Sequence, residues 1–188
     1  MRLIAGIFLL FACLPVMANC VNSITPSCDV YDSCFNKYCN CTGSDEEYLM
    51  SFGKQYCDAF LNEHSFTSNG NQWRDNTLRC LQEAIVPSIP FTDTKSCNCQ
   101  EVKKIAYTSH VSCYTQPNSS VCDLPSADIK LIAATIIFNN KFISAMKDYS
   151  LGIEQVRDTF TKCSSTAKEE GNRKQWTFYS KLLHGKLK

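Results

Sequence analysis

Glycine and histidine are scarce in this sequence, and their scarcity argues against several kinds of catalytic site. The 188 residues include seven glycines and three histidines, His64, His110 and His184. No histidine lies in an HExxH motif, in which two histidines bind zinc, and no Gly-x-Ser-x-Gly elbow presents a serine nucleophile. The sequence therefore indicates neither a zinc protease of this type nor a serine hydrolase.

After its first residues, the chain has no excess of charge of one sign. It also has no long apolar run there. The formal net charge of +1 includes Arg2. Without that residue the chain is neutral, which predicts no nucleic-acid partner. The most apolar later run, Leu131–Phe138, has eight residues, too few to cross a membrane. We therefore expect this segment to be a core helix.

Residues 1–18 have the composition of a secretory signal peptide. Arg2 gives a positive start, Leu3–Leu14 is apolar, and Val16-Met-Ala18 places small residues where a signal peptidase cleaves. The apolar core is too short for a membrane span. Cleavage after Ala18 predicts a secreted, extracellular chain of residues 19–188.

Cysteine is abundant. Of 13 cysteines, Cys13 leaves with the signal peptide, and the even number that remains predicts up to six disulfides in an oxidising compartment. The close pairs Cys39-x-Cys41 and Cys97-x-Cys99 suggest a zinc site as the alternative. The usual CxxC spacing and matching histidines are absent, so we expect no metal and no cofactor. The cysteines predicted to form disulfides are Cys20, Cys28, Cys34, Cys39, Cys41, Cys57, Cys80, Cys97, Cys99, Cys113, Cys122 and Cys163.

The spacing of apolar residues predicts an all-α fold in one domain, residues 19–170. Apolar positions recur at helical spacing in five segments, at about 45–62, 73–86, 94–114, 129–143 and 150–163. Residues 19–43 are dense in cysteines and turn formers, so we expect an irregular amino-terminal segment. Strand signals are weak. The predicted fold is a disulfide-stapled bundle of about five helices.

Local signals predict where some helices begin. Ser44-Asp-Glu-Glu47 has the pattern of a capping box, and Ser126 that of an N-cap. Thr67-Ser-Asn-Gly70 reads as a loop. The sequons Asn40-Cys-Thr42 and Asn118-Ser-Ser120 predict surface glycans on Asn40 and Asn118.

Residues 171–188 form a basic tail that contains no acidic residue. Trp176, Tyr179 and Leu183 can form an apolar stripe on a surface helix that binds acidic lipid or sulfated glycan. The other interpretation, which we prefer, is a solvated and partly frayed tail.

The segment Ala106–Tyr114, AYTSHVSCY, is similar to the active-site helix of secreted phospholipases A2, because His110 precedes Cys113-Tyr114 by one turn. Such a site needs a carboxylate beside the histidine and a glycine-rich calcium loop. Here Val111 follows His110, and no Tyr-Gly-Cys-x-Cys-Gly loop is present. We therefore expect no enzyme and treat His110 as an ordinary helix residue.

The order of the cysteines from Cys57 onward resembles that of the stanniocalcins, a family of secreted glycoprotein hormones. A sequon beside a cysteine of the amino-terminal segment is a further similarity, and the resemblance covers roughly residues 28–165. The matching elements are Cys57-Asp-Ala-Phe60, Gly70-Asn-Gln-Trp73, Leu78-Arg-Cys80-Leu81, Cys97 or Cys99, and Cys113-Tyr114 with Cys122.

The resemblance implies a set of disulfides. Cys80 would pair with Cys113, and the inward positions of both cysteines on neighbouring helices support that bond independently. The chain has no cysteine after Cys163, which puts the family's covalent dimer in doubt. The other implied pairs are Cys122–Cys163, Cys34–Cys57, Cys28–Cys39, and Cys41 with either Cys97 or Cys99. Cys20 would then pair with whichever of Cys97 and Cys99 is left.

Three functions follow from these observations. By resemblance, the leading one is a hormone-like glycoprotein that binds an extracellular protein, a receptor or a protease. Its role would be calcium or phosphate homeostasis or inhibition of a secreted metalloproteinase. The alternative is a saposin-like lipid-binding module, suggested by the apolar helix and the basic tail. The third is the phospholipase A2-like enzyme.

Overall fold

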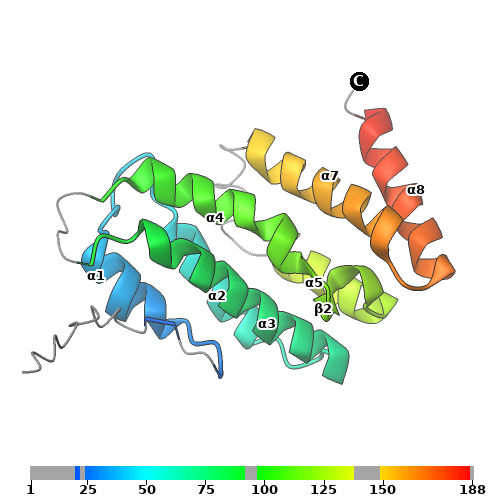
Figure 1. Cartoon of the computed structure of the whole chain (residues 1–188), viewed down its shortest axis with the longest axis horizontal. Coiled ribbons are helices and arrows are strands. Elements are labelled where there is room, and N and C mark those ends of the chain that lie inside the picture. Colours follow the sequence, from blue (N-terminus) through cyan, green and yellow to red (C-terminus); the bar gives the residue numbers. More distant parts are fainter. Residues whose placement is uncertain (1–19, 22–23, 92–96, 138–148, 187–188) are drawn as a thin grey trace, which may run out of the picture.

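The computed structural model describes residues 20–21, 24–91, 97–137 and 149–186. The predicted signal peptide lies outside these residues. The fold is all-α, as the sequence predicts, and Figure 1 shows its helices packed around one another. The α-helices are α1 (Asn36–Tyr38), α2 (Lys54–Leu61), α3 (Ser68–Ile85), α4 (Cys99–Tyr114), α5 (Ser126–Ile137), α7 (Tyr149–Thr166) and α8 (Glu170–Lys186).

Short irregular elements join these helices. A π-helical turn, Tyr31–Phe35, leads into α1, and a second, Leu49–Gly53, leads into α2. Strands β1 (Thr115–Gln116) and β2 (Ser119–Ser120) form a small antiparallel hairpin after α4. The sequence predicted neither the helical turn near residue 31 nor the hairpin, because both are too short to show a periodic pattern.

The hydrogen bonds at the starts of two helices show that the predicted starts were wrong. Thr67 caps α3, because its hydroxyl accepts a hydrogen bond from the Gly70 N–H (3.2 Å), so Ser68–Gly70 are helical and not a loop. Ser44 caps nothing, since its hydroxyl donates to the Cys41 carbonyl. Glu47 instead accepts a hydrogen bond from the Met50 N–H (2.9 Å).

Two tryptophans anchor the helices to the connections between them. Trp73 of α3 is buried and donates its Nε1–H to the Tyr114 carbonyl at the end of α4 (3.1 Å). Trp176 of α8 is buried and donates to the Cys122 carbonyl (3.1 Å). These bonds satisfy polar groups that would otherwise be buried without partners.

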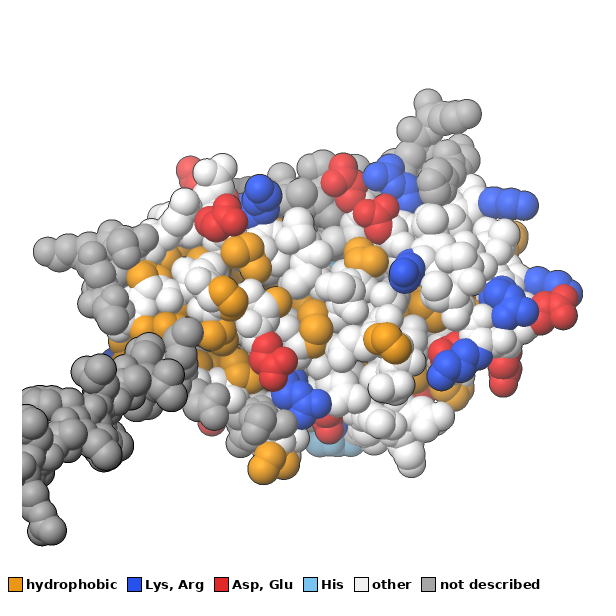
Figure 2. Space-filling model, viewed as in Figure 1, with side chains coloured by type: hydrophobic (Ala, Val, Ile, Leu, Met, Phe, Trp, Pro, Cys, Tyr) orange, Lys and Arg blue, Asp and Glu red, His pale blue; other side chains and the backbone are white. Residues whose placement is uncertain are grey.

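Helix α8 corrects the prediction of a frayed tail. It packs beside α7, with Trp176 and Tyr179 against the ring of Phe160. Lys174 pairs with Glu170 (2.7 Å), the acidic residue just before the predicted tail. Figure 2 shows that the basic side chains at this end of the molecule lie among acidic ones. The side chain of Leu183 lies outside the described part, and the predicted lipid or glycan contact stays a prediction.

Six disulfides join the twelve cysteines that remain after residue 18. Three agree with the pairs implied by the cysteine order: Cys80–Cys113 between α3 and α4, Cys122–Cys163, and Cys41–Cys99. The other three are Cys20–Cys34, Cys28–Cys57 and Cys39–Cys97.

The pairs Cys34–Cys57, Cys28–Cys39 and Cys20 with Cys97 or Cys99 were therefore wrong predictions. The helical turn and α1 separate Cys28 from Cys39 along a rigid segment of about 12 Å, at 1.5 Å per residue. That separation exceeds the reach of a disulfide. Cys28 pairs with α2 instead, and Cys39, beyond the end of α1, pairs with Cys97.

Candidate functional site

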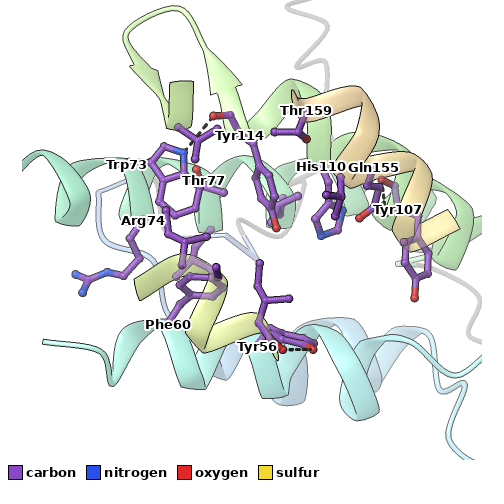
Figure 3. Close-up of a pocket in the computed structure, with 18 of the residues that line it drawn as sticks. Tyr56, Phe60, Trp73, Arg74, Thr77, Tyr107, His110, Tyr114, Gln155 and Thr159 are labelled. Carbon is purple, nitrogen blue, oxygen red and sulfur yellow. Dashed lines mark hydrogen bonds between the residues drawn. The ribbon is translucent and has the colours of Figure 1, made fainter. Parts of the chain in front are cut away.

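A cavity of about 540 Å³ lies among the helices and is the candidate site (Figure 3). Side chains from α2, α3, α4, α5, α7 and α8 line it, together with the turn before α2. Its volume falls within the range of about 300–1,000 Å³ that is typical of small-molecule sites. The cavity thus joins segments from the whole described chain.

The wall is mostly aromatic and aliphatic. Phe52 contacts Tyr56 with ring centroids 4.5 Å apart, and Tyr48 contacts Tyr107 at 5.3 Å. Helix α5 contributes an aliphatic side through Ile129, Ile132 and Ile136. Such a wall favours an apolar ligand over water.

Helix α5 is held in place by two contacts at opposite ends. At its start the buried carboxylate of Asp128 accepts hydrogen bonds from the N–H and the hydroxyl of Thr67 (3.0 and 2.5 Å). Near its end the carbonyl of Ile136 accepts a hydrogen bond from the hydroxyl of Tyr56 (3.2 Å). Together these bonds fix the aliphatic side of the cavity against α2 and α3.

Helix α7 borders the cavity beside α4. The side-chain amide of Gln155 donates to the Tyr107 carbonyl (2.9 Å) and holds the two helices together. Gly152 lines the cavity, and a Cβ added there would meet no atom within 4 Å. This position is therefore open enough to accept a larger side chain.

His110 and Tyr114, one turn apart on α4, are two of the few polar groups that face the cavity (Figure 3). Their rings meet edge to face with centroids 5.3 Å apart. His110 is 7% exposed, and its Nδ1 lies 2.6 Å from the Ala106 carbonyl. Burial lowers the pKa of His110 to about 4 and raises the pKa of the Tyr114 hydroxyl. Both groups are therefore uncharged at neutral pH.

The surroundings of His110 differ from those of a phospholipase histidine. Within the described residues its contacts are the Ala106 and Tyr107 backbone and the rings of Tyr107 and Tyr114, and none is a carboxylate. Burial lowers the pKa of the imidazole more than the hydrogen bonds to the Ala106 and Tyr107 carbonyls raise it, so the ring is a weaker base than a free histidine. The expectation that the chain is no enzyme stays a prediction.

The four cysteines considered for zinc do come together. The Sγ atoms of Cys39, Cys41, Cys97 and Cys99 all lie within 4.8 Å of one another. In the structure they form the bonds Cys39–Cys97 and Cys41–Cys99. A sulfur in a disulfide has no thiolate to offer a metal ion, so in this state the cluster is a structural staple.

Both predicted glycosylation sites are at the surface. Asn40 is exposed, and its side-chain oxygen accepts a hydrogen bond from the Thr42 N–H (3.0 Å), which holds the sequon in a turn. Asn118 is exposed in the turn between β1 and β2. Each side chain is therefore accessible for modification.

Sequence reasoning missed the cavity. Its wall residues were recognised only as inward positions of the predicted helices, and an apolar stripe looks the same whether it faces a filled core or a void.

In comparisons with family models, with curated proteins and with solved structures, nothing matches this chain. None of the described helices has the length and apolar character needed to cross a membrane.

Proposed function

We propose that this protein is a secreted binding protein that carries a small apolar ligand in the cavity. The observation that carries the proposal is the apolar cavity of about 540 Å³ in an all-α fold braced by six disulfides. Disulfides persist in extracellular compartments, and they support the proposed secretion. The proposal favours the lipid-binding alternative among the three functions.

The energetics of empty space support an occupant. An apolar void costs about 24 cal/mol for each Å³. Because the cavity is partly open to the surface, this cost applies only to its enclosed part. Elsewhere an empty cavity leaves apolar wall in contact with water, which is also unfavourable. Water is a poor occupant, because few polar groups in the wall can bind it.

Titration with an uncharged, polarity-sensitive fluorescent dye tests the proposal. The wild-type protein should bind one dye molecule with a large rise in emission, and Gly152→Leu should weaken binding by at least tenfold because leucine occupies the cavity. Gly171→Leu is the matched control, since Gly171 is also helical, has no atom within 4 Å of an added Cβ, and does not line the cavity. Equal binding by both variants would contradict the proposal.

A second candidate is the hormone-like function that the stanniocalcin resemblance implies. The pairs Cys80–Cys113 and Cys122–Cys163 support the resemblance. Phe178 on α8 is 63% exposed and offers an apolar contact for a receptor or a protease. Labelled protein should then bind saturably to cells, and Phe178→Ser should reduce that binding without changing dye affinity. Binding that neither saturates nor responds to Phe178→Ser would count against this function.

A further inference from the structure

We propose that the ligand is an uncharged lipid with a hydroxyl group, and that this hydroxyl binds between His110 and Tyr114. The inference rests on the proposed function of the cavity and adds the chemical class of its ligand. Long-chain alcohols and hydroxylated polycyclic lipids belong to this class. The contacts of the two side chains define which hydrogen bonds the ligand must make.

His110 offers the ligand an acceptor. Its Nδ1 lies 2.6 Å from the Ala106 carbonyl, and a carbonyl oxygen can only accept, so Nδ1 carries the hydrogen. In the neutral ring Nε2 then has a free lone pair. The hydrogen bonds described for this ring are made to carbonyls of its own helix, those of Ala106 and Tyr107, and Figure 3 shows the ring directed into the space opposite Tyr56. A ligand that fills this space must donate a hydrogen bond there.

Tyr114 supplies the complementary donor. Its side chain follows that of His110 by one helical turn and extends into the same space in Figure 3. Burial raises the pKa of its hydroxyl, with a smaller contribution from Tyr56, and the hydroxyl therefore keeps its hydrogen. The hydrogen bond described for Tyr114 is made by its backbone carbonyl, which accepts from Trp73. An acceptor and a donor side by side match a ligand hydroxyl, which can donate to Nε2 and accept from the tyrosine.

The charges of the wall disfavour a carboxylate beside His110. Of the described lining residues, the cations are Arg74 and Lys130. Arg74 is already paired with Asp75 (2.8 Å) and bonded to the Glu63 carbonyl, while Lys130 is exposed. A carboxylate buried against the neutral imidazole would have no partner for its charge. The hydroxyl is therefore the better match for the polar end of this cavity.

Competition against the dye by a fatty alcohol, the fatty acid and the alkane of equal chain length tests the inference. The alcohol should displace the dye about tenfold more strongly than the alkane, because it gains a buried hydrogen bond. His110→Phe keeps a ring but removes the acceptor, and should bring the alcohol-to-alkane ratio close to one. His110→Gln restores an acceptor oxygen and should recover part of the preference.

Several results would overturn the inference. These are equal binding of alcohol and alkane by the wild type, a preference that persists in His110→Phe, or a preference for the acid that disappears in Lys130→Gln. Should His110→Phe not fold by circular dichroism, Tyr114→Phe removes a single oxygen and should reduce the ratio in the same way. Failure of the dye itself to bind the wild type would instead contradict the proposed function of the cavity.

Discussion

Asp128, in the first turn of α5, accepts two hydrogen bonds from Thr67, the residue that caps α3. The carboxylate thus joins the starts of two helices through a contact between residues that lie 61 positions apart in sequence. It also lies against Gly70, where an added Cβ would come within 2.7 Å of the carboxylate. This buried acid therefore holds the start of α5, the helix that forms one side of the cavity.

Gly70→Ala should destabilise the protein. The new methyl group must displace either Asp128 or the α3 backbone, so we expect a loss of about 1–3 kcal/mol in the free energy of unfolding. Chemical denaturation measures it. In Gly171→Ala the added Cβ meets nothing within 4 Å, and the change should be neutral or stabilising by up to about 1 kcal/mol. Equal effects of the two substitutions would contradict the close contact at Gly70.

Asp128→Asn should also destabilise the protein. The amide nitrogen cannot accept a hydrogen bond, so one of the two Thr67 donors loses its charged partner in a buried site. We expect a loss of about 1–3 kcal/mol, measured by the same method, together with weaker dye binding because α5 is less well held. Unchanged stability would show that the hydrogen bonds to Thr67 do not hold α5.

Stability should depend on pH through His110. The pKa of this histidine is about 4 in the folded chain and 6.5 ordinarily, so the unfolded chain takes up the proton first as pH falls. Stability from the neutral ring is complete above pH 6.5 and falls as the pH drops towards 4, by about 3 kcal/mol in all. Denaturation of the wild type and His110→Gln across this range measures the effect. A difference in the free energy of unfolding between the wild type and His110→Gln that stays the same at every pH would contradict this prediction.

The disulfide Cys80–Cys113 should stabilise the pair α3 and α4. It closes a loop with a sequence separation of 33, and its replacement by two alanines should reduce the free energy of unfolding by about 4 kcal/mol. Peptide mapping under non-reducing conditions should recover the two cysteines in one linked pair. Recovery of Cys113 linked to another cysteine would contradict both the fold and the resemblance to the stanniocalcins.

The two sequons should carry glycans when the chain is made in a secreting eukaryotic cell. Asn40→Gln and Asn118→Gln should each remove the mass of one glycan, since both side chains are exposed. Enzymatic removal of N-glycans should lower the mass of the wild type and leave the double variant unchanged. A single substitution that leaves the mass of the secreted chain unaltered would show that its site is unused.

Some of the fold follows directly from the sequence. The helical spacing of Trp73, Thr77, Cys80 and Ile85 predicts most of α3. The resemblance to the stanniocalcins implies the bond Cys80–Cys113, which the inward positions of both cysteines support independently and which the structure contains. The amino-terminal pairings were harder to predict, because many closely spaced cysteines permit many combinations. The short helical turn at Tyr31–Phe35, which separates Cys28 from Cys39, leaves no clear periodic signal.

The rest of the site depends on contacts between distant segments. The order at residues 171–186 comes from Trp176, whose indole is buried against Cys122, and a local excess of basic residues gives no sign of that contact. The cavity depends on the distance between helices, which Asp128, Tyr56 and Gln155 set through hydrogen bonds to other elements. His110 could be placed on a helix from sequence, but the space in front of it could not.

The most direct test of the central claim is native mass spectrometry of the protein purified from secreting cells without detergent. We predict that the wild type and Gly171→Leu retain one lipid molecule per chain, and that organic extraction recovers a lipid with a hydroxyl group and no charge. Gly152→Leu should lose most of this bound mass. A wild-type protein that is folded, fully disulfide-bonded and free of any bound lipid would contradict the claim.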